Sequence, residues 1–173
     1  LPSFIRTMAQ LETRGLGGIF GAAIYADSMN SSMNIFHIGQ GGISLPDEAY
    51  YREEQYQPIR EAFIAHVKKM GELTGVPLLA QEILALETEI ASHHWDQVKD
   101  RDATLTYNKK SFNDLAAITT HFDWPTWITA SATPEHVLEN VIVRQPSYFE
   151  GLSKILGKFE INKWQAWLTW HIL

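Results

Sequence analysis

Residues 58–91, PIREAFIAHVKKMGELTGVPLLAQEILALETEIA, decide the fold class of this chain. Apolar side chains recur there every three or four residues, which is the period of a helix with one buried face. Pro58 and Pro77 each suit the first turn of a helix, and Gly71 or Gly75 would end the first helix. The stretch therefore predicts two successive helices, and the short connection between them favours an antiparallel pair. The two apolar stripes are Ile59, Phe63, Val67 and Met70, then Leu79, Ile83, Leu86 and Ile90.

The chain before this stretch predicts one β-hairpin. Residues 18–27 (GIFGAAIYAD) and 35–40 (IFHIGQ) are rich in aromatic and β-branched residues without a helical period, so each predicts a strand. The polar residues 28–34 (SMNSSMN) predict the turn between them. A short helix at residues 4–11 would precede the hairpin, and we interpret the glycine-rich residues 15–18 as a loop that ends this helix.

The chain after the two helices predicts further helices and one short strand. Ser111 and Asp114 have the spacing of a capping pair that opens a helix. No repeat or low-complexity linker divides the chain, so residues 1–173 are expected to form a single domain. The sequence predicts a mainly α fold with a minor β-hairpin and a short strand. The remaining segments are a loop at 99–108, a turn and short helix at 122–128, a strand within 140–146, and helices at 147–157 and 161–173.

The last segment, INKWQAWLTWHIL (residues 161–173), is apolar nearly all the way round if it is helical. We expect Trp164, Trp167, Leu168 and Trp170 to pack against chain that follows this segment, and the isolated piece to associate through the same surface. Since the sequence also begins with leucine, we interpret it as an excerpt from a larger protein. The alternative is a terminal helix that docks within its own small domain.

Composition excludes several classes of protein. With 45% hydrophobic and 12% aromatic residues, the chain is folded and globular. Its net charge of −6 argues against a nucleic-acid or anionic-membrane surface, and no apolar run approaches the ~20 residues of a membrane helix. The absence of cysteine excludes disulfides and thiolate metal sites within this stretch. It also fits a reducing compartment, which slightly favours a cytoplasmic location over export.

The residues themselves indicate no catalytic centre. Glu89, His93 and Asp96 would share one face if the helix continued through SHHWD, and zinc accepts such ligands, although a solvated surface helix is the preferred interpretation. No histidine is followed by Glu-x-x-His, and neither a Gly-x-Ser-x-Gly elbow nor a phosphate loop is present. We interpret the polar cluster of Arg101, Asp102, Tyr107 and Asn108 as a loop pinned by side-chain hydrogen bonds.

Six motifs together resemble the neprilysin-like zinc metallopeptidases, the family of neprilysin, endothelin-converting enzyme and bacterial endopeptidase O. The resemblance covers about residues 19–173, and the motifs occur in the order found in that family. The motifs are a strand–turn–strand followed by Leu45-Pro46 and Tyr50-Tyr51, a Leu-Glu-x-Glu-x-Ala helix with Glu87 and Glu89, Arg101-Asp102 with Tyr107-Asn108, the tryptophan segment FDWPTWI, the stretch NVIVRQPSYF, and the closing WLTWHIL.

The resemblance implies a helical cap-type domain that faces a catalytic domain of the same chain across an enclosed chamber. The intact protein would then be a zinc metalloendopeptidase that hydrolyses peptides, with the cap limiting access to the chamber. The family's zinc ligands and catalytic residues belong to motifs that this chain lacks, so none can be assigned here and the piece alone should be inactive. Substrate-binding residues stay unknown. Since animal members bear disulfides, the absence of cysteine points to the bacterial branch.

Two alternatives remain open at this stage. The first is a free-standing all-α interaction module that binds a partner through the tryptophan-rich helix. The second is a small metal-binding protein that uses Glu89, His93 and Asp96.

Overall fold

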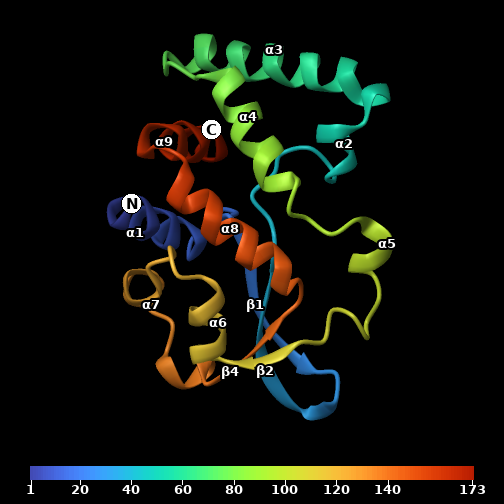
Figure 1. The fold of residues 1–173 in the computed structure, drawn as a ribbon. Helices are drawn as coiled ribbons and strands as arrows, with labels where there is room; N and C mark the ends of the chain where they lie inside the picture. Colours follow the sequence, from blue (N-terminus) through green and yellow to red (C-terminus); the bar gives the residue numbers. More distant parts are fainter.

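The computed structural model describes residues 1–173 and shows a mainly α fold with a small sheet, as predicted (Figure 1). The helices are α1 (Pro2–Glu12), α2 (Ala49–Arg52), α3 (Gln57–Thr74), α4 (Ala80–Ala91), α5 (Gln97–Asp100), α6 (Phe112–Ile118), α7 (Trp124–Ser131), α8 (Pro146–Lys158) and α9 (Ile161–Ile172). The strands are β1 (Phe20–Asp27), β2 (Asn30–Gln40), β3 (Lys109–Ser111) and β4 (Asn140–Val143), and two 3-10 turns lie at Glu54–Tyr56 and Glu135–Leu138.

The four strands form one sheet in the order β1-β2-β4-β3. β1 and β2 make the predicted antiparallel hairpin, β4 pairs with β2 in parallel, and β3 pairs with β4 antiparallel. The predicted turn at 28–34 is wrong, because β2 already begins at Asn30. The Asp27 carboxylate accepts the backbone N–H of Met29 at 2.9 Å, so a two-residue turn suffices and the polar residues after it extend the strand.

The two helices that decided the fold class are present, but they are not an antiparallel pair. Gly75 adopts the left-handed conformation, with φ of 71°, and ends α3 as a C-cap. From there α4 turns away and descends towards the sheet, while α3 lies at the opposite end of the molecule (Figure 1). The cluster of four buried residues beneath α3 is separate from the main core and consists of Phe63, Val67, Ala80 and Ile83.

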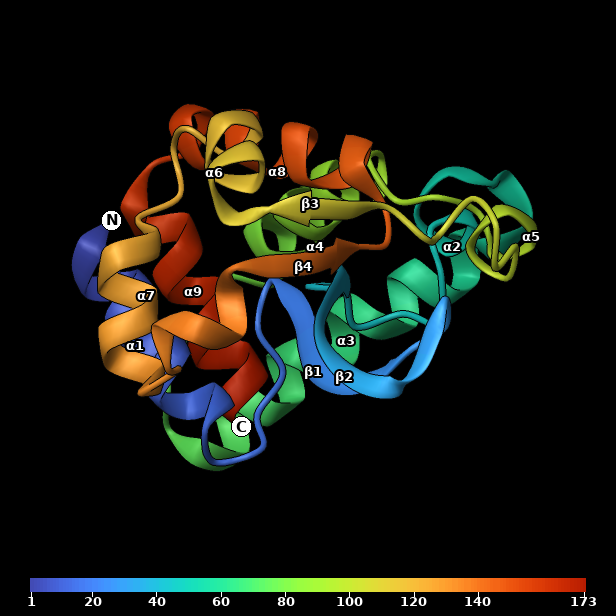
Figure 2. The same ribbon diagram turned by 90° about the horizontal axis from the view of Figure 1, so that it is seen from below.

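The main core of 25 buried residues lies between the sheet and helices α1, α4, α6, α7, α8 and α9. Figure 2 shows α1, α7 and α9 gathered beside the strands. Aromatic rings dominate the centre of the core. Phe20 of β1 contacts Trp124 and Trp127 of α7, each with ring centroids 5.7 Å apart, and it contacts Phe149 of α8 at 5.8 Å. These contacts join residues more than 100 positions apart, so the core rather than local propensity fixes the position of the hairpin.

The tryptophan-rich helix α9 packs within this domain, which corrects the expectation from the sequence. Trp164 and Trp167 are 0% exposed and Leu168 is 8% exposed. The ring of Phe4 on α1 lies 5.4 Å from Trp164 and 6.4 Å from Trp167. Burial of the two indoles stabilises the fold by several kcal/mol at about 25 cal/mol per Å². No chain beyond residue 173 is needed to cover them.

Trp170 is the outermost of these tryptophans, and it too has partners inside the chain. Its indole N–H donates to Ser44 Oγ at 2.9 Å, and its ring meets Phe63 of α3 edge-on at 5.6 Å. The apolar surface that was expected to drive association is therefore occupied. The interaction-module alternative loses the surface on which it rested.

Candidate functional site

The possible metal site at Glu89, His93 and Asp96 is not formed. The helix α4 ends at Ala91, so the last two of these residues lie beyond it. Glu89 instead pairs with Lys158 at 3.0 Å, and Asp96 caps α5 by accepting the backbone N–H of Lys99 at 2.9 Å. No group of three or more His, Cys, Asp and Glu side chains in the chain is placed to share a metal ion.

The first group of family-motif residues meets around a buried carboxylate, Glu87 of α4, which is 0% exposed. The hydroxyl of Tyr51 on α2 donates to Glu87 Oε2 at 2.6 Å. Ser44 donates twice, with its backbone N–H to Oε2 at 3.0 Å and with its hydroxyl to Oε1 at 2.7 Å. Burial, and next the charge of Glu87, raise the pKa of Tyr51 above its ordinary value, so this hydroxyl stays protonated and keeps donating.

The imidazole of His171 completes this junction from α9. Its Nε2 lies 3.0 Å from Glu87 Oε1, and its ring centroid lies 4.0 Å from that of Trp167, with the two rings tilted by 35°. Glu87 therefore joins the 41–48 loop, α2, α4 and α9 at one point. The neighbouring motif residues Leu45, Pro46 and Tyr50 lie around this loop, where Tyr50 stacks on Tyr56 and none is fully buried.

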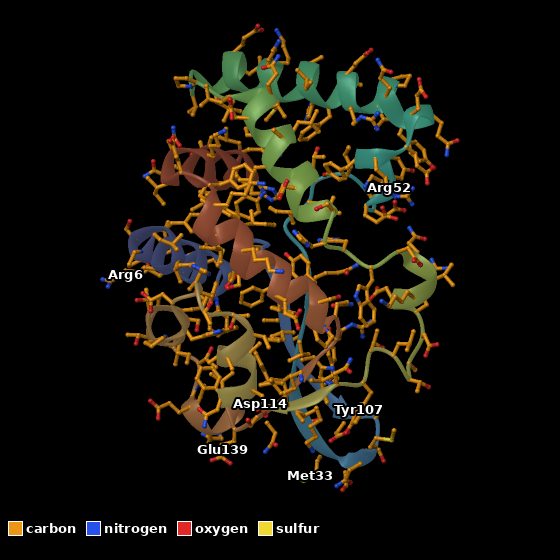
Figure 3. The ribbon with its side chains drawn as sticks, viewed as in Figure 1. Arg6, Met33, Arg52, Tyr107, Asp114 and Glu139 are labelled. Carbon is orange, nitrogen blue, oxygen red and sulfur yellow. The ribbon has the colours of Figure 1, made fainter.

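A second carboxylate, Asp27 at the end of β1, holds the hairpin to the middle of the chain. It is 3% exposed and accepts the Tyr107 hydroxyl at 2.9 Å and the Lys109 ammonium at 3.2 Å. Figure 3 shows Tyr107 beside the hairpin, with Met33 nearer its tip. The backbone N–H of Met29, and then Tyr107 and Lys109, lower the pKa of Asp27 against an opposing effect of burial.

The remaining motif residues pin the loop that carries Tyr107, as interpreted from the sequence. Asp102 Oδ1 accepts the backbone N–H groups of Thr104 at 2.8 Å and Leu105 at 3.1 Å. The side-chain amide of Asn108 donates to the carbonyl of Leu105 at 2.6 Å. Arg101 is exposed and donates to Gln97 at 3.3 Å. These residues shape the loop by hydrogen bonds within it, and no reacting group is gathered there.

Two glutamines that the sequence did not single out fasten the hairpin from the other side. The Gln40 side chain accepts the backbone N–H of Trp95 at 2.7 Å and donates to its carbonyl at 3.0 Å. Gln145, which is 1% exposed, accepts the backbone N–H of Gln40 at 2.8 Å, and its amide donates to Asp100. Amide side chains of this kind give no periodic or charge signal in a sequence, so only the structure identifies them.

One further carboxylate was missed by the sequence, and it lines a cavity. Glu12 Oε2, at the end of α1, accepts the indole N–H of Trp127 at 2.7 Å, while Oε1 is buried without a partner. Burial raises the pKa of Glu12 to about 7, although the bond from Trp127 lowers it. The cavity has a volume of about 370 Å³ and is also lined by Gly18, Phe20 and Gly21. We call it the Glu12 cavity.

The close approach of backbone to this carboxylate explains one glycine of the 15–18 loop. A Cβ atom on Gly18 would lie 1.7 Å from Glu12 Oε1, whereas a Cβ atom on Gly17 would meet nothing within 4 Å. An alanine at position 18 would therefore displace the Glu12 side chain from its present position. The glycine-rich residues 15–18 form a loop between α1 and β1, as predicted. Among the glycines of this loop, only Gly18 is in close contact with another side chain.

Comparisons with known proteins agree with the motif order. The sequence model of peptidase family M13 matches residues 2–173. The structure resembles the Mycobacterium tuberculosis zinc metalloprotease Zmp1 in its open state, with 34% identity and a TM-score of 0.93 over 98% of this chain and 27% of that one. PepO from Lactobacillus rhamnosis HN001, at 17% identity and a TM-score of 0.72 over 98% of this chain and 27% of that one, shows the shared fold alone.

Curated relatives give the same picture at lower identity. The chain is 26% identical to endothelin-converting enzyme 1 of Cavia porcellus over 86% of its length, which is 21% of that protein. It is also 26% identical to an endothelin-converting enzyme homologue of Locusta migratoria over 96% of its length, which is 26% of that protein. The chain therefore spans about a fifth to a quarter of the length of these relatives.

None of its helices has the length and apolar character needed to cross a bilayer.

Proposed function

The chain belongs to peptidase family M13, and from this premise we propose that it is the non-catalytic cap region of a zinc metalloendopeptidase that hydrolyses peptides. The proposal rests on the structural similarity to Zmp1, which is described as a zinc metalloprotease. The similarity covers 98% of this chain but only 27% of Zmp1. The acidic and imidazole groups of this chain do not fit a zinc site, because no three of them converge. The metal and its ligands would therefore belong to the rest of the parent protein.

The role of this chain in the proposal is to form a wall of a chamber and to limit which substrates enter. Its three polar junctions, at Glu87, Asp27 and Gln145, fasten the hairpin and helices to one another, which suits a wall that must keep its shape. Zmp1 is described both in an open state and in a partial open state, which supports a chamber whose opening varies. When bound, zinc would polarise the scissile carbonyl and activate water.

A bacterial source is part of the same proposal. The chain has no cysteine and is 34% identical to the Mycobacterium tuberculosis protein, against 26% for the animal relatives named above. The cytoplasmic compartment that the absence of cysteine favours stays a prediction.

The test of the peptidase assignment compares this chain with the longer protein that contains it. With zinc and a fluorogenic peptide, the 173-residue chain should show no turnover, and the longer protein should show turnover that a chelator removes. A His-Glu-x-x-His motif in the coding sequence after residue 173 is expected. Chelator-sensitive, zinc-dependent turnover by the 173-residue chain alone would overturn the proposal.

The cap role needs a separate measurement on the longer protein. One cleavage sequence is presented twice, once as a short free peptide and once in an exposed loop of a folded protein. Size exclusion predicts cleavage of the peptide and not of the folded carrier. Equal cleavage rates for the two substrates would contradict the cap role while leaving the peptidase assignment intact.

A further inference from the structure

The outer edge of the sheet is open for a peptide backbone. β1 is the terminal strand in the order β1-β2-β4-β3, and its side chains from Gly21 to Ala26 are exposed or half-buried. From Gly21 to Tyr25, the backbone groups that face away from β2 have no hydrogen-bond partner in the chain. The strand contains neither proline nor lysine, the residues that commonly protect an edge from pairing. Its first exposed residues are small, so a second backbone can approach closely.

The Glu12 cavity lies beside the start of this edge. Phe20, Gly21 and Ala22 of β1 form part of its lining, together with Trp127. Its volume of about 370 Å³ is large enough for a long side chain. Glu12 is the only charged residue in the lining, and its Oε1 has no hydrogen-bond partner. A basic side chain entering the cavity would give this carboxylate the counter-charge that the chain itself does not provide.

We propose that an extended peptide binds to the outer edge of β1 as a fifth strand of the sheet, with a lysine or arginine side chain in the Glu12 cavity. This rests on the proposed function, since it assigns the occupant as the peptide substrate and its class as basic. Strand addition of this kind takes affinity from main-chain hydrogen bonds and specificity from a pocket beside the edge. The net charge of −6 favours the approach of a cationic peptide.

The acid–base state of the cavity agrees with such an occupant. Burial raises the pKa of Glu12 to about 7, so the carboxyl is close to half ionised in neutral solution. A cation in the cavity lowers the pKa again and draws the group into its charged form. Basic peptides should therefore bind more tightly as the pH rises from about 6 to about 8.

The experiment measures binding and needs no catalysis. A fluorescent peptide of sequence Thr-Val-Arg-Val-Thr, blocked at both ends, is titrated with the 173-residue chain and followed by anisotropy. Replacing its arginine by norleucine should weaken binding about tenfold, because an ion pair in a partly buried site is lost. N-methylation of one alternating set of peptide amides should weaken binding more than tenfold, whereas methylation of the other set should have little effect.

Three protein variants locate the site. Gly21→Trp should weaken binding more than tenfold by filling the cavity mouth, and an added Cβ there meets nothing within 4 Å, so the fold can accept it. Ser32→Trp, exposed on β2 of the same hairpin, is the matched control and should bind as the parent chain does. Glu12→Gln should bind the arginine and norleucine peptides equally.

Several results would overturn the proposal. The first is that the arginine peptide does not bind. The second is that methylation of either set of amides weakens binding equally. The third is that Glu12→Gln still binds the arginine peptide more tightly than the norleucine peptide. A dimer in light scattering that Gly21→Trp dissociates would show that a second copy of the chain occupies the edge. Each of these outcomes leaves the peptidase assignment standing, because that assignment depends on turnover by the longer protein.

Discussion

Replacing Glu12 by glutamine should stabilise the domain at alkaline pH and leave its stability almost unchanged near pH 4. Burial raises the pKa of this carboxyl from 4.5 to about 7. A carboxyl whose pKa is higher in the folded state than in the unfolded state holds its proton more tightly when folded. Its favourable contribution is therefore complete below about pH 4.5 and is lost as the pH rises through about 7. Glutamine keeps an acceptor for Trp127 and never ionises.

The magnitude follows from the difference in pKa. A difference of about 2.5 units corresponds to about 3 kcal/mol at 1.36 kcal/mol per unit, reached once the pH is well above 7. The side chain is partly exposed, so this is an upper limit. For a domain of 173 residues, 1 kcal/mol shifts the melting temperature by about 2–4 °C. Glu12→Gln should then melt up to about 6–12 °C higher than the parent chain near pH 9.

The assay is thermal unfolding of the parent chain, Glu12→Gln and a matched control at about pH 5, 7 and 9. Glu54→Gln serves as the control, because Glu54 is exposed and forms no ion pair. The difference between Glu12→Gln and the parent chain should grow with pH, and that of the control should not. Two results would refute this reasoning: a difference in melting temperature between Glu12→Gln and the parent chain that does not change with pH, or a lower melting temperature of Glu12→Gln near pH 9. Either result would mean that ionisation of Glu12 does not destabilise the folded state.

Three further substitutions test the junctions and the glycine contact. Tyr51→Phe removes the 2.6 Å hydrogen bond to the buried Glu87 carboxylate and should lower the free energy of unfolding in urea by about 1–3 kcal/mol; an unchanged midpoint would contradict the role of the junction. Gly18→Ala should destabilise by about 1–3 kcal/mol in the same assay, while Gly17→Ala should be nearly neutral, and equal effects would refute the contact argument. The pKa of Asp27 is lower in the folded state than the unfolded value of 3.8, so the ionised carboxylate stabilises the fold above that pH, and this stabilisation is lost as the pH falls further. In Asp27→Asn, the urea midpoint should therefore depend less on pH below about 4 than it does in the parent chain. An unchanged dependence on pH would contradict this role of Asp27.

Local patterns in the sequence gave reliable local structure. The apolar stripes predicted α3 and α4, and the alternation of aromatic and β-branched residues predicted the hairpin. Ser111 and Asp114 form the full capping box at the start of α6, as their spacing indicated. Each of these features depends on residues within a few positions of one another, which is why a single sequence carries them.

Two of the errors involve contacts between distant segments. Trp164 is covered by Phe4, which is 160 positions earlier, and nothing near α9 in the sequence announces that partner. Glu12 likewise finds Trp127 115 positions later, so its buried state and its cavity could not be anticipated. The extension of α4 towards Asp96 failed for a local reason, because that side chain caps the next short helix instead. The family motifs were recognised, but their roles as junctions required the structure.

The small separate cluster that includes Phe63 and Val67 is the only buried apolar contact of α3, so this long helix is weakly held. Four buried residues hold α3 on α4, whereas 25 buried residues form the core around the sheet. The free energy needed to open a segment locally scales with the apolar area it exposes, so α3 can detach while the sheet remains intact. Its amide hydrogens should exchange with deuterium before those of α8, and a protease should cut first near Gly75.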